Sequence, residues 1–187
     1  MQSIIDFKLV FERLNEELKL INQSLELVCA GGYVLQLHGF RGTADVDAFF
    51  ETNAAIESAI QNVGDEFGIN TPDEVWLNNS IMKMNPPPPP EHRTLVHSFS
   101  NLKVEAVDLI YLIGMKLISG RGQDLKDVAD ILKHNNDEHP LELLDKLNGM
   151  EFAVDISGLL DIYEKAHGME WLTKFYEDNV EELRKHF

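Results

Sequence analysis

The residues best suited to chemistry are two aspartates, Asp45 and Asp47, separated only by Val46. Side chains at alternate positions of a β-strand point to the same face, so a strand here would project both carboxylates together. Neighbouring carboxylates repel each other unless a cation or a hydrogen-bond donor compensates. Mg²⁺ prefers such oxygen ligands, and metal-held phosphates commonly serve phosphoryl and nucleotidyl transfer. The pair therefore predicts a Mg²⁺ site, although an Asp-x-Asp pair alone also occurs at ordinary strand ends and caps.

A glycine doublet, Gly31-Gly32, precedes the aspartates and follows the apolar run LELVCA at 25–30. Glycine has no Cβ, so backbone N–H groups at the doublet could approach a phosphate closely. The short helix expected to follow would direct its N-terminus at the same phosphate. The order strand, Gly-Gly, short helix, turn, Asp-x-Asp strand is much more specific than either motif alone.

The elements that must position these residues form a mixed α/β half followed by a helical half. Helical periodicity, short apolar runs and turn residues mark the elements of the first half. They are helices over 4–20 and 53–68, strands over 25–30 and 45–50, and a hairpin of strands over 93–101 and 102–107. From Val107 onward every segment has a helical pattern. We therefore expect an α+β fold with an α/β core at 1–106 and a helical region at 107–187 that packs against it.

The chain of 187 residues carries 16 basic and 32 acidic side chains, a formal net charge of −16 at pH 7. Such a charge repels long nucleic acids on average, whereas a metal-bridged nucleotide is compatible with it. Solubility alone would explain the acidic excess equally well. No apolar run approaches the roughly 20 residues of a membrane span, and the N-terminal sequence lacks a signal-peptide layout. With Cys29 as the lone cysteine, a reducing cytoplasm is the expected location.

The segment from Gly31-Gly32 to Asp47 resembles the nucleotidyltransferase fold of the polymerase-β type, in which a Gly-Gly or Gly-Ser doublet precedes an apolar-Asp-apolar-Asp strand. The string GGYVLQLHGFRGTADVDAFF is similar to the branch that contains AbiEii-type toxins and related uncharacterised bacterial nucleotidyltransferases. In that branch an Arg and a Ser or Thr precede the Asp pair, as Arg41 and Thr43 do here.

A second segment, LIGMKLISGRGQDLKDVADIL, is similar to the C-terminal signature of that branch, with Lys116, Arg121, Asp124 and Asp127 at the signature positions. Lys116 lies on an otherwise apolar helix, and a buried ammonium needs a partner, either a phosphate or the Asp pair. Asp124 and Asp127 are three apart and would share one helical face. The alternative is that Lys116 reaches the surface and Asp124 caps its helix.

The resemblance implies a Mg²⁺-dependent enzyme that transfers a nucleoside monophosphate from a nucleoside triphosphate, bound between the sheet and the helical half, to an unknown acceptor. It also suggests a toxin–antitoxin component with an antitoxin-like partner protein. The implied catalytic residues are Asp45, Asp47, Lys116 and Asp124, of which Asp45 and Asp47 would hold the metal. The implied nucleotide-binding residues are Gly31, Gly32, Arg41, Thr43 and Arg121.

Two features leave alternatives open. Many members of the wider fold supply a third carboxylate, for which Glu105 is the best candidate here, although it could equally face solvent. Without a third carboxylate, Asp124 could complete the charge set, or the protein could be an inactive nucleotide-binding or interaction module. The run Pro86–Pro90 must be extended, and it is either a loop spacer or a ligand for a proline-binding module.

Overall fold

The computed structural model describes residues 5–83, 85–135 and 139–186, so Ile4, the expected first residue of the first helix, lies outside it. The chain divides into two compact units, Met1–Asp108 and Leu109–Phe187. No helix in the described part of the chain is long and apolar enough to cross a membrane.

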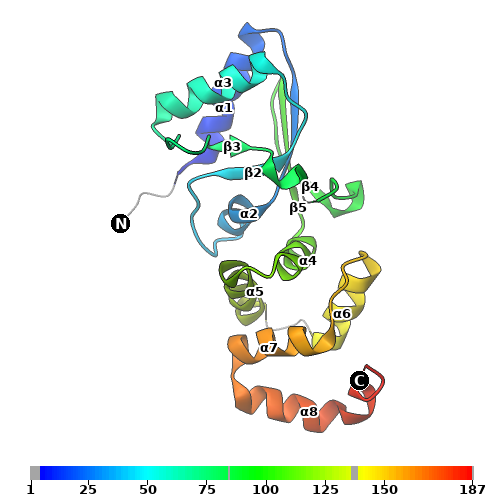
Figure 1. Ribbon diagram of the computed structural model, residues 1–187. Coiled ribbons are helices and arrows are strands. Elements are labelled where there is room, and N and C mark those ends of the chain that lie inside the picture. Colours follow the sequence, from blue (N-terminus) through cyan, green and yellow to red (C-terminus); the bar gives the residue numbers. More distant parts are fainter. Residues whose placement is uncertain (1–4, 84, 136–138, 187) are drawn as a thin grey trace. The chain divides into compact units, whose positions relative to one another are not determined.

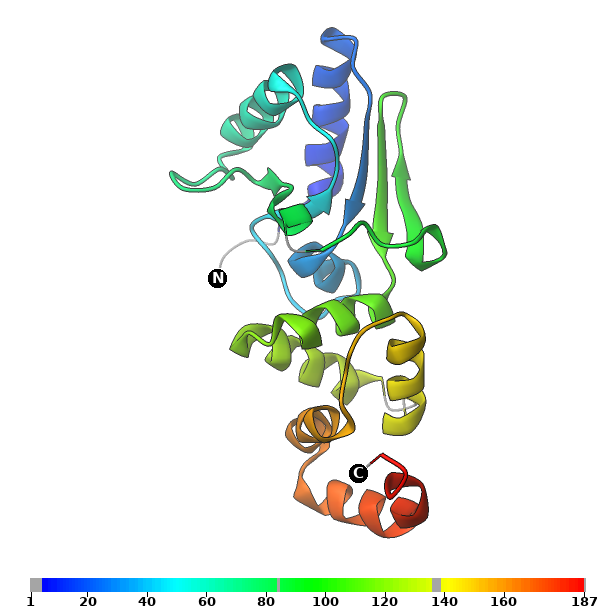
Figure 2. The same ribbon diagram turned by 45° about the vertical axis from the view of Figure 1, so that its right-hand side comes forward.

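The first unit is built on a five-stranded mixed sheet (Figure 1), with the strand order β3-β2-β1-β5-β4. The central strand β1 runs antiparallel to β2 on one side and parallel to β5 on the other. The short strand β3 is parallel to β2, and β4 is antiparallel to β5. Figure 2 shows the β4–β5 pair as the predicted hairpin. The strands are β1 Leu25–Cys29, β2 Val46–Phe49, β3 Leu77–Asn78, β4 Arg93–Ser98 and β5 Leu102–Val107.

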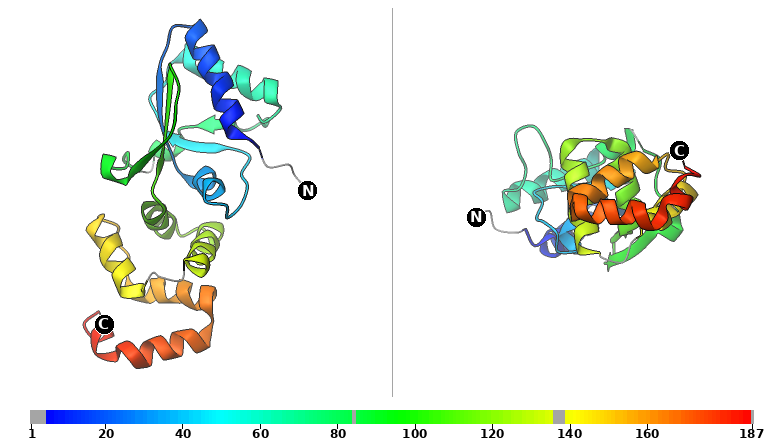
Figure 3. Two further views of the ribbon diagram at one scale, coloured as in Figure 1. Left: turned by 180° about the vertical axis from the view of Figure 1, so that it is seen from behind. Right: turned by 90° about the horizontal axis from the view of Figure 1, so that it is seen from below.

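Helices α1 and α3 lie on the same side of this sheet (Figure 3, left), and an aromatic cluster fills the space beneath them. The indole of Trp76 is buried, and its Nε1 donates a hydrogen bond of 2.9 Å to the carbonyl of Ile60. The cluster also contains Phe7, Phe11 and Tyr33. The helical elements of this unit are α1 Phe7–Leu20, α2 Gly31–Leu37, α3 Ala54–Phe67 and the 3₁₀ turns η1 Ser80–Lys83 and η2 Pro90–His92.

Local sequence explains where these elements start and stop. Asn53 caps α3 through hydrogen bonds from the backbone of Ala55 and Ile56, and Gly68 ends α3 in the left-handed conformation. Both ends of α3 are as the sequence predicts. The predicted strand over 45–50 is shorter in the structure, because β2 begins at Val46 and Asp45 belongs to the turn before it.

The second unit contains five helices, among the residues that the structure describes. Helix α4 is almost wholly apolar, and its Gly114 faces the ring of Phe152, where a Cβ would lie only 2.3 Å from a ring carbon. The helices are α4 Leu109–Ser119, α5 Gly122–His134, α6 Pro140–Gly149, α7 Ile156–His167 and α8 Met169–Leu183. The prediction of a mixed sheet with flanking helices, followed by helices alone, is therefore confirmed.

Candidate active site

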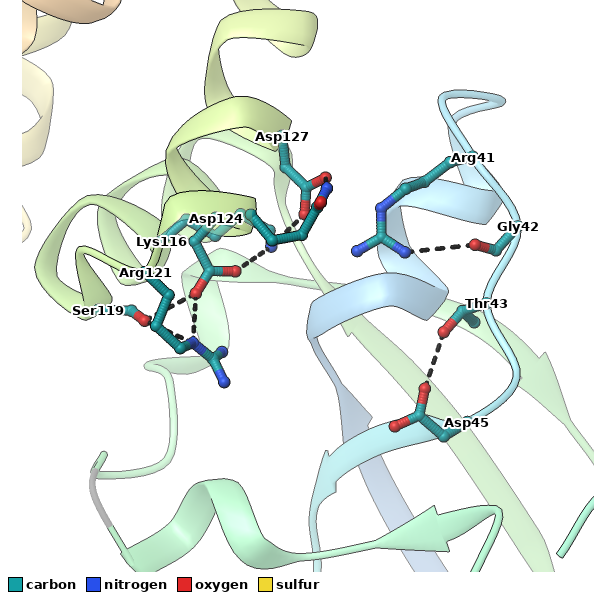
Figure 4. Close-up of polar contacts among 10 residues, drawn as sticks. Arg41, Gly42, Thr43, Asp45, Lys116, Ser119, Arg121, Asp124 and Asp127 are labelled. Carbon is teal, nitrogen blue, oxygen red and sulfur yellow. Dashed lines mark hydrogen bonds and ion pairs between the residues drawn. The ribbon is translucent and has the colours of Figure 1, made fainter. Parts of the chain in front are cut away.

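Asp45 directly precedes β2 and Asp47 lies within it, and burial alternates along this segment. Val46 and Ala48 are fully buried, whereas Asp45 and Asp47 are only half-buried. The two carboxylates therefore emerge on the less buried side of the strand. Asp45 Oδ1 accepts a hydrogen bond of 2.8 Å from Thr43 Oγ1, and Figure 4 shows this hydroxyl directed at the carboxylate. Thr43 thus fixes the orientation of one of the two acids.

The glycine doublet packs directly against these residues. A Cβ on Gly31 would lie 2.6 Å from Asp47 Oδ2, and Gly31 has a φ of +60°, which side-chain-bearing residues rarely adopt. A Cβ on Gly32 would lie 2.5 Å from Thr43 Oγ1. The backbone N–H of Ala30 also donates to the carbonyl of Asp47 at 2.8 Å. Glycine is required at both positions because the start of α2 approaches the acidic pair and its supporting threonine so closely.

We expect Gly31→Ala to destabilise the first unit and to weaken Mg²⁺ binding at the acidic pair by tenfold or more, because its Cβ must displace the Asp47 carboxylate. Gly68→Ala is the matched control, since Gly68 has a φ of +65° but no atom within 4 Å of the added Cβ. Both variants should lose roughly 1–2 kcal/mol from the left-handed backbone alone. Urea unfolding and Mg²⁺ titration would separate the two effects. Equal Mg²⁺ affinity in both variants would show that the packing of Gly31 against Asp47 does not matter for the metal.

Gln36 is a supporting residue that the sequence analysis missed. Its Oε1 accepts a hydrogen bond of 3.0 Å from the backbone N–H of Thr43, and its Nε2 donates to the carbonyl of Ile5 at 2.8 Å. Gln36 therefore ties the turn that carries Thr43 to α2 and to the segment before α1. The exposed Arg41 lies in the same turn, where its Nη1 donates to the carbonyl of Gly42 at 3.3 Å. A glutamine within a short apolar helix gives no sequence signal for this role.

Glu74 is a second residue that the sequence analysis missed. Asn78 pairs with Asp47 in the β2–β3 register, and its Nδ2 donates to Glu74 Oε1 at 3.3 Å. Partial burial and the nearby charges of Asp45 and Asp47 raise the pKa of Glu74 above its ordinary value. The start of β2 is therefore a region of negative potential, which attracts cations.

Glu105, the candidate third carboxylate, lies on β5, which neighbours β1 rather than β2. Its carboxylate is 2.7 Å from Lys103 Nζ and 3.9 Å from Arg93 Nη1, so it is ion-paired within the hairpin. Among the residues that the structure describes, no group of three or more His, Cys, Asp or Glu side chains could hold a metal ion.

Lys116 is the centre of a buried ionic cluster in the second unit. Lys116 Nζ donates to Asp124 Oδ1 at 2.6 Å and to Asp127 Oδ2 at 2.7 Å, and all three side chains are buried. The partner of this ammonium is thus the Asp pair, one of the two partners that the sequence suggests. The alternative in which Lys116 reaches the surface and Asp124 caps its helix is wrong. Lys116 is buried, and the N-cap position of α5 is occupied by Arg121, whose side chain makes no capping hydrogen bond.

The remaining carboxylate oxygens of the cluster also have donors. Asp124 Oδ2 accepts hydrogen bonds from Ser119 Oγ and Arg121 Nε, each of 2.7 Å. Gln123 Nε2 donates to Asp127 Oδ1 at 2.8 Å. The side chain of Arg121 is nevertheless 79% exposed, and Figure 4 shows its guanidinium at the outer side of the cluster. Asp124 therefore fixes the position of Arg121, while most of the Arg121 side chain faces solvent.

The charge of Asp124 predicts how acid affects stability. Burial raises the pKa of Asp124, but the hydrogen bonds from Lys116, Ser119 and Arg121 outweigh burial, so this pKa is lowered in the folded chain. The stability that Asp124 contributes is therefore complete above the pKa of the unfolded carboxyl, about 3.9, and is lost as the pH falls through the lower folded-state pKa. We expect the free energy of unfolding to fall below about pH 4, less steeply in Asp124→Asn than in the wild type.

Urea unfolding across acidic pH would measure this dependence. Asp161→Asn removes an exposed carboxylate of the same unit and serves as the control. The same acid slope in Asp124→Asn and in the wild type would contradict the assignment.

Residues 6–177 match the family model described as "Nucleotidyltransferase of unknown function (DUF6036)". Comparisons with curated proteins and with solved structures gave no match. The family match spans both units, including the acidic pair of the first unit and the ionic cluster of the second.

Proposed function

Because the chain belongs to a nucleotidyltransferase family, we propose that it transfers a nucleoside monophosphate from a Mg²⁺-bound nucleoside triphosphate to an acceptor. The observation that carries the proposal is the close packing of Gly31 against Asp47 and of Gly32 against Thr43, which holds Asp45. That packing joins the doublet and the acidic pair into one structural group.

The donor set at the start of β2 fits Mg²⁺. Asp45 and Asp47 offer hard oxygen ligands, and Mg²⁺ in proteins commonly takes one or two carboxylates and completes its shell with substrate phosphates and water. A bound Mg²⁺ would neutralise charge on the phosphates during transfer. Glu74 contributes negative potential that favours the cation, and it is better placed than Glu105 to do so.

The phosphates are assigned to the glycine doublet and its neighbours. The first N–H groups of a helix have no acceptor within that helix, and those of Gly31 and Gly32 lie at the start of α2. Arg41 is exposed on the turn before β2 and would supply a cation. The hydroxyl of Thr43 donates to Asp45, so we assign Thr43 to positioning that carboxylate. Its backbone N–H donates to Gln36, which supports this positioning role.

The residues of the second unit receive different roles. Asp124 holds both Lys116 and Arg121, so we assign it to positioning these two cations. Arg121 is the exposed one and would bind phosphate oxygens. The ammonium of Lys116 is occupied by the carboxylates of Asp124 and Asp127. For Lys116 to stabilise the transferring phosphate or the leaving pyrophosphate, a phosphate oxygen must replace one of these two contacts.

The assignment of the protein to a particular branch of nucleotidyltransferases rests on the resemblance to AbiEii-type toxins. We propose that the chain belongs to that branch and works with an antitoxin-like partner protein. Its charge of −16 favours a protein side chain or a small molecule over a long RNA as the acceptor. A gene for a small partner beside the gene of this chain, and co-purification of the two products, would support this role.

A nucleotide-binding module without transfer activity is the second candidate, and the ion pairing of Glu105 favours it. Incubation with each of the four nucleoside triphosphates, labelled at the α-phosphate, separates the two candidates. An enzyme releases pyrophosphate and labels itself or an added acceptor in the presence of Mg²⁺ but not of EDTA. A module binds the nucleotide in calorimetry without releasing pyrophosphate. Absence of Mg²⁺-dependent binding would contradict both.

A further inference from the structure

The run Pro86–Pro90 has a defined conformation. The proline ring fixes φ near −65°, and a residue that precedes a proline is held in the extended region. Each of Pro86, Pro87, Pro88 and Pro89 precedes another proline, so all four are held in a polyproline II helix. Pro89 has φ −60° and ψ 151°, close to the polyproline II values. The helix ends where Pro90 begins η2.

The burial pattern along the run fits the geometry of this helix. A polyproline II helix has three residues per turn, so its side chains form three ridges. Pro86 and Pro89 share one ridge and both are exposed, as is Pro87 on the next ridge. Pro88 is the buried proline of the run, and the four other prolines are exposed. The ridge of Pro88 therefore faces the protein, and the ridges of Pro86/Pro89 and Pro87/Pro90 face solvent.

The inward ridge is held in place by hydrogen bonds. Arg93 donates to the carbonyl of Pro88 from Nε, at 2.7 Å, and also from Nη2. The guanidinium of Arg93 also lies 3.9 Å from the carboxylate of Glu105. The backbone N–H of His92 donates to the carbonyl of Pro89 at 3.0 Å. Figure 2 shows residues 85–89, which lead into η2, as an extended trace without helical turns.

We propose that Pro86–Pro90 is a docking ligand for a partner domain with a groove lined by parallel aromatic rings. Such grooves bind two adjacent ridges of a polyproline II helix, and two ridges are what this segment presents. The segment is fixed before binding, so association would cost little conformational entropy. The alternative, a loop spacer between η1 and β4, does not explain the fixed conformation. A spacer needs neither a buried proline such as Pro88 nor two hydrogen bonds from Arg93 to its carbonyl.

The experiment titrates the full chain into three isotope-labelled probes, an SH3 domain, a WW domain and an EVH1 domain, and follows the NMR signals of their aromatic grooves. We expect the wild-type chain to shift the groove signals of at least one probe. The variant Pro86→Ala with Pro89→Ala should weaken that binding at least tenfold, because it removes one of the two outward ridges that the groove must bind together. Pro72→Ala, a change at an exposed proline of another loop, should leave binding unchanged.

Arg93→Ala tests the anchor. It leaves every exposed proline in place, so we expect a weakening of a few-fold from lost pre-organisation, with the fold checked by circular dichroism. Two results would overturn the proposal: no groove shift in any probe with the wild-type chain, or equal affinity of the wild type and the Pro86/Pro89 double variant.

Discussion

Replacement of Asp45 and Asp47 together by asparagine is expected to lower Mg²⁺-dependent nucleotide affinity by at least about 100-fold, since even residues behind a metal ligand commonly cost 10–100-fold. Asparagine keeps the size of aspartate and can still accept the hydrogen bond from Thr43. The change therefore removes charge with little change in shape. Removal of paired like charges also relieves repulsion, so the thermal midpoint of the first unit should stay the same or rise.

Calorimetry of a nucleoside triphosphate with and without Mg²⁺ would measure this effect. The control is Glu51→Gln with Glu57→Gln, which removes the same charge from exposed positions of the same unit. The control should bind as the wild type does, apart from a small change in long-range attraction for the metal. Unchanged nucleotide affinity in the aspartate double variant would show that the site lies elsewhere.

Lys116→Met is expected to cost about 3–5 kcal/mol of stability, the usual cost when one partner of a buried ion pair is removed. Methionine fills a similar volume but leaves the charges of Asp124 and Asp127 buried without their shared ammonium. The loss should be confined to the second unit. Hydrogen-exchange mass spectrometry would locate it, with faster exchange in α4 and α5 and unchanged exchange in β1 and β2.

A compensated variant separates the structural role of Lys116 from a catalytic one. Lys116→Met with Asp124→Asn and Asp127→Asn removes every charge of the buried cluster, and we expect it to recover most of the lost stability. If Lys116 also stabilises the transferring phosphate, this variant stays inactive although it is folded. Full activity in the compensated variant would exclude a role for Lys116 in transfer. Wild-type stability of Lys116→Met alone would contradict the expected cost of leaving two buried carboxylates without their ammonium.

Residues that interact over short sequence distances were predicted well. The closeness of Gly31-Gly32 to Asp47 could be predicted because the doublet, the short helix and the Asp-x-Asp strand follow one another closely in the sequence. The caps of α3 follow from the local chemistry of Asn53 and Gly68. That Lys116 needs a partner could be predicted because it is an ammonium on an apolar helix. The sequence left a phosphate and the Asp pair as alternatives, and the structure shows the Asp pair.

Residues whose roles depend on distant pairing could not be predicted. Glu74 comes near the acidic pair because β3, a strand of only two residues, pairs in parallel with β2, and two residues carry no periodicity. Gln36 acts through its hydrogen bond with the backbone N–H of Thr43, and this bond can form only when the chain between the two residues has folded. The predicted strand over 45–50 was one residue too long at each end, because β2 spans only Val46–Phe49.

The position of β1 in the sheet has a consequence for protein synthesis. One side of β1 pairs with β2, which follows soon after it, but the other side pairs with β5, so that Leu25 meets Leu102. On the ribosome, the doublet and the acidic pair therefore emerge while one edge of β1 is still open to pairing with other chains. Chaperone demand should thus be greatest during this interval, and a truncation before β5 should aggregate although it contains both motifs.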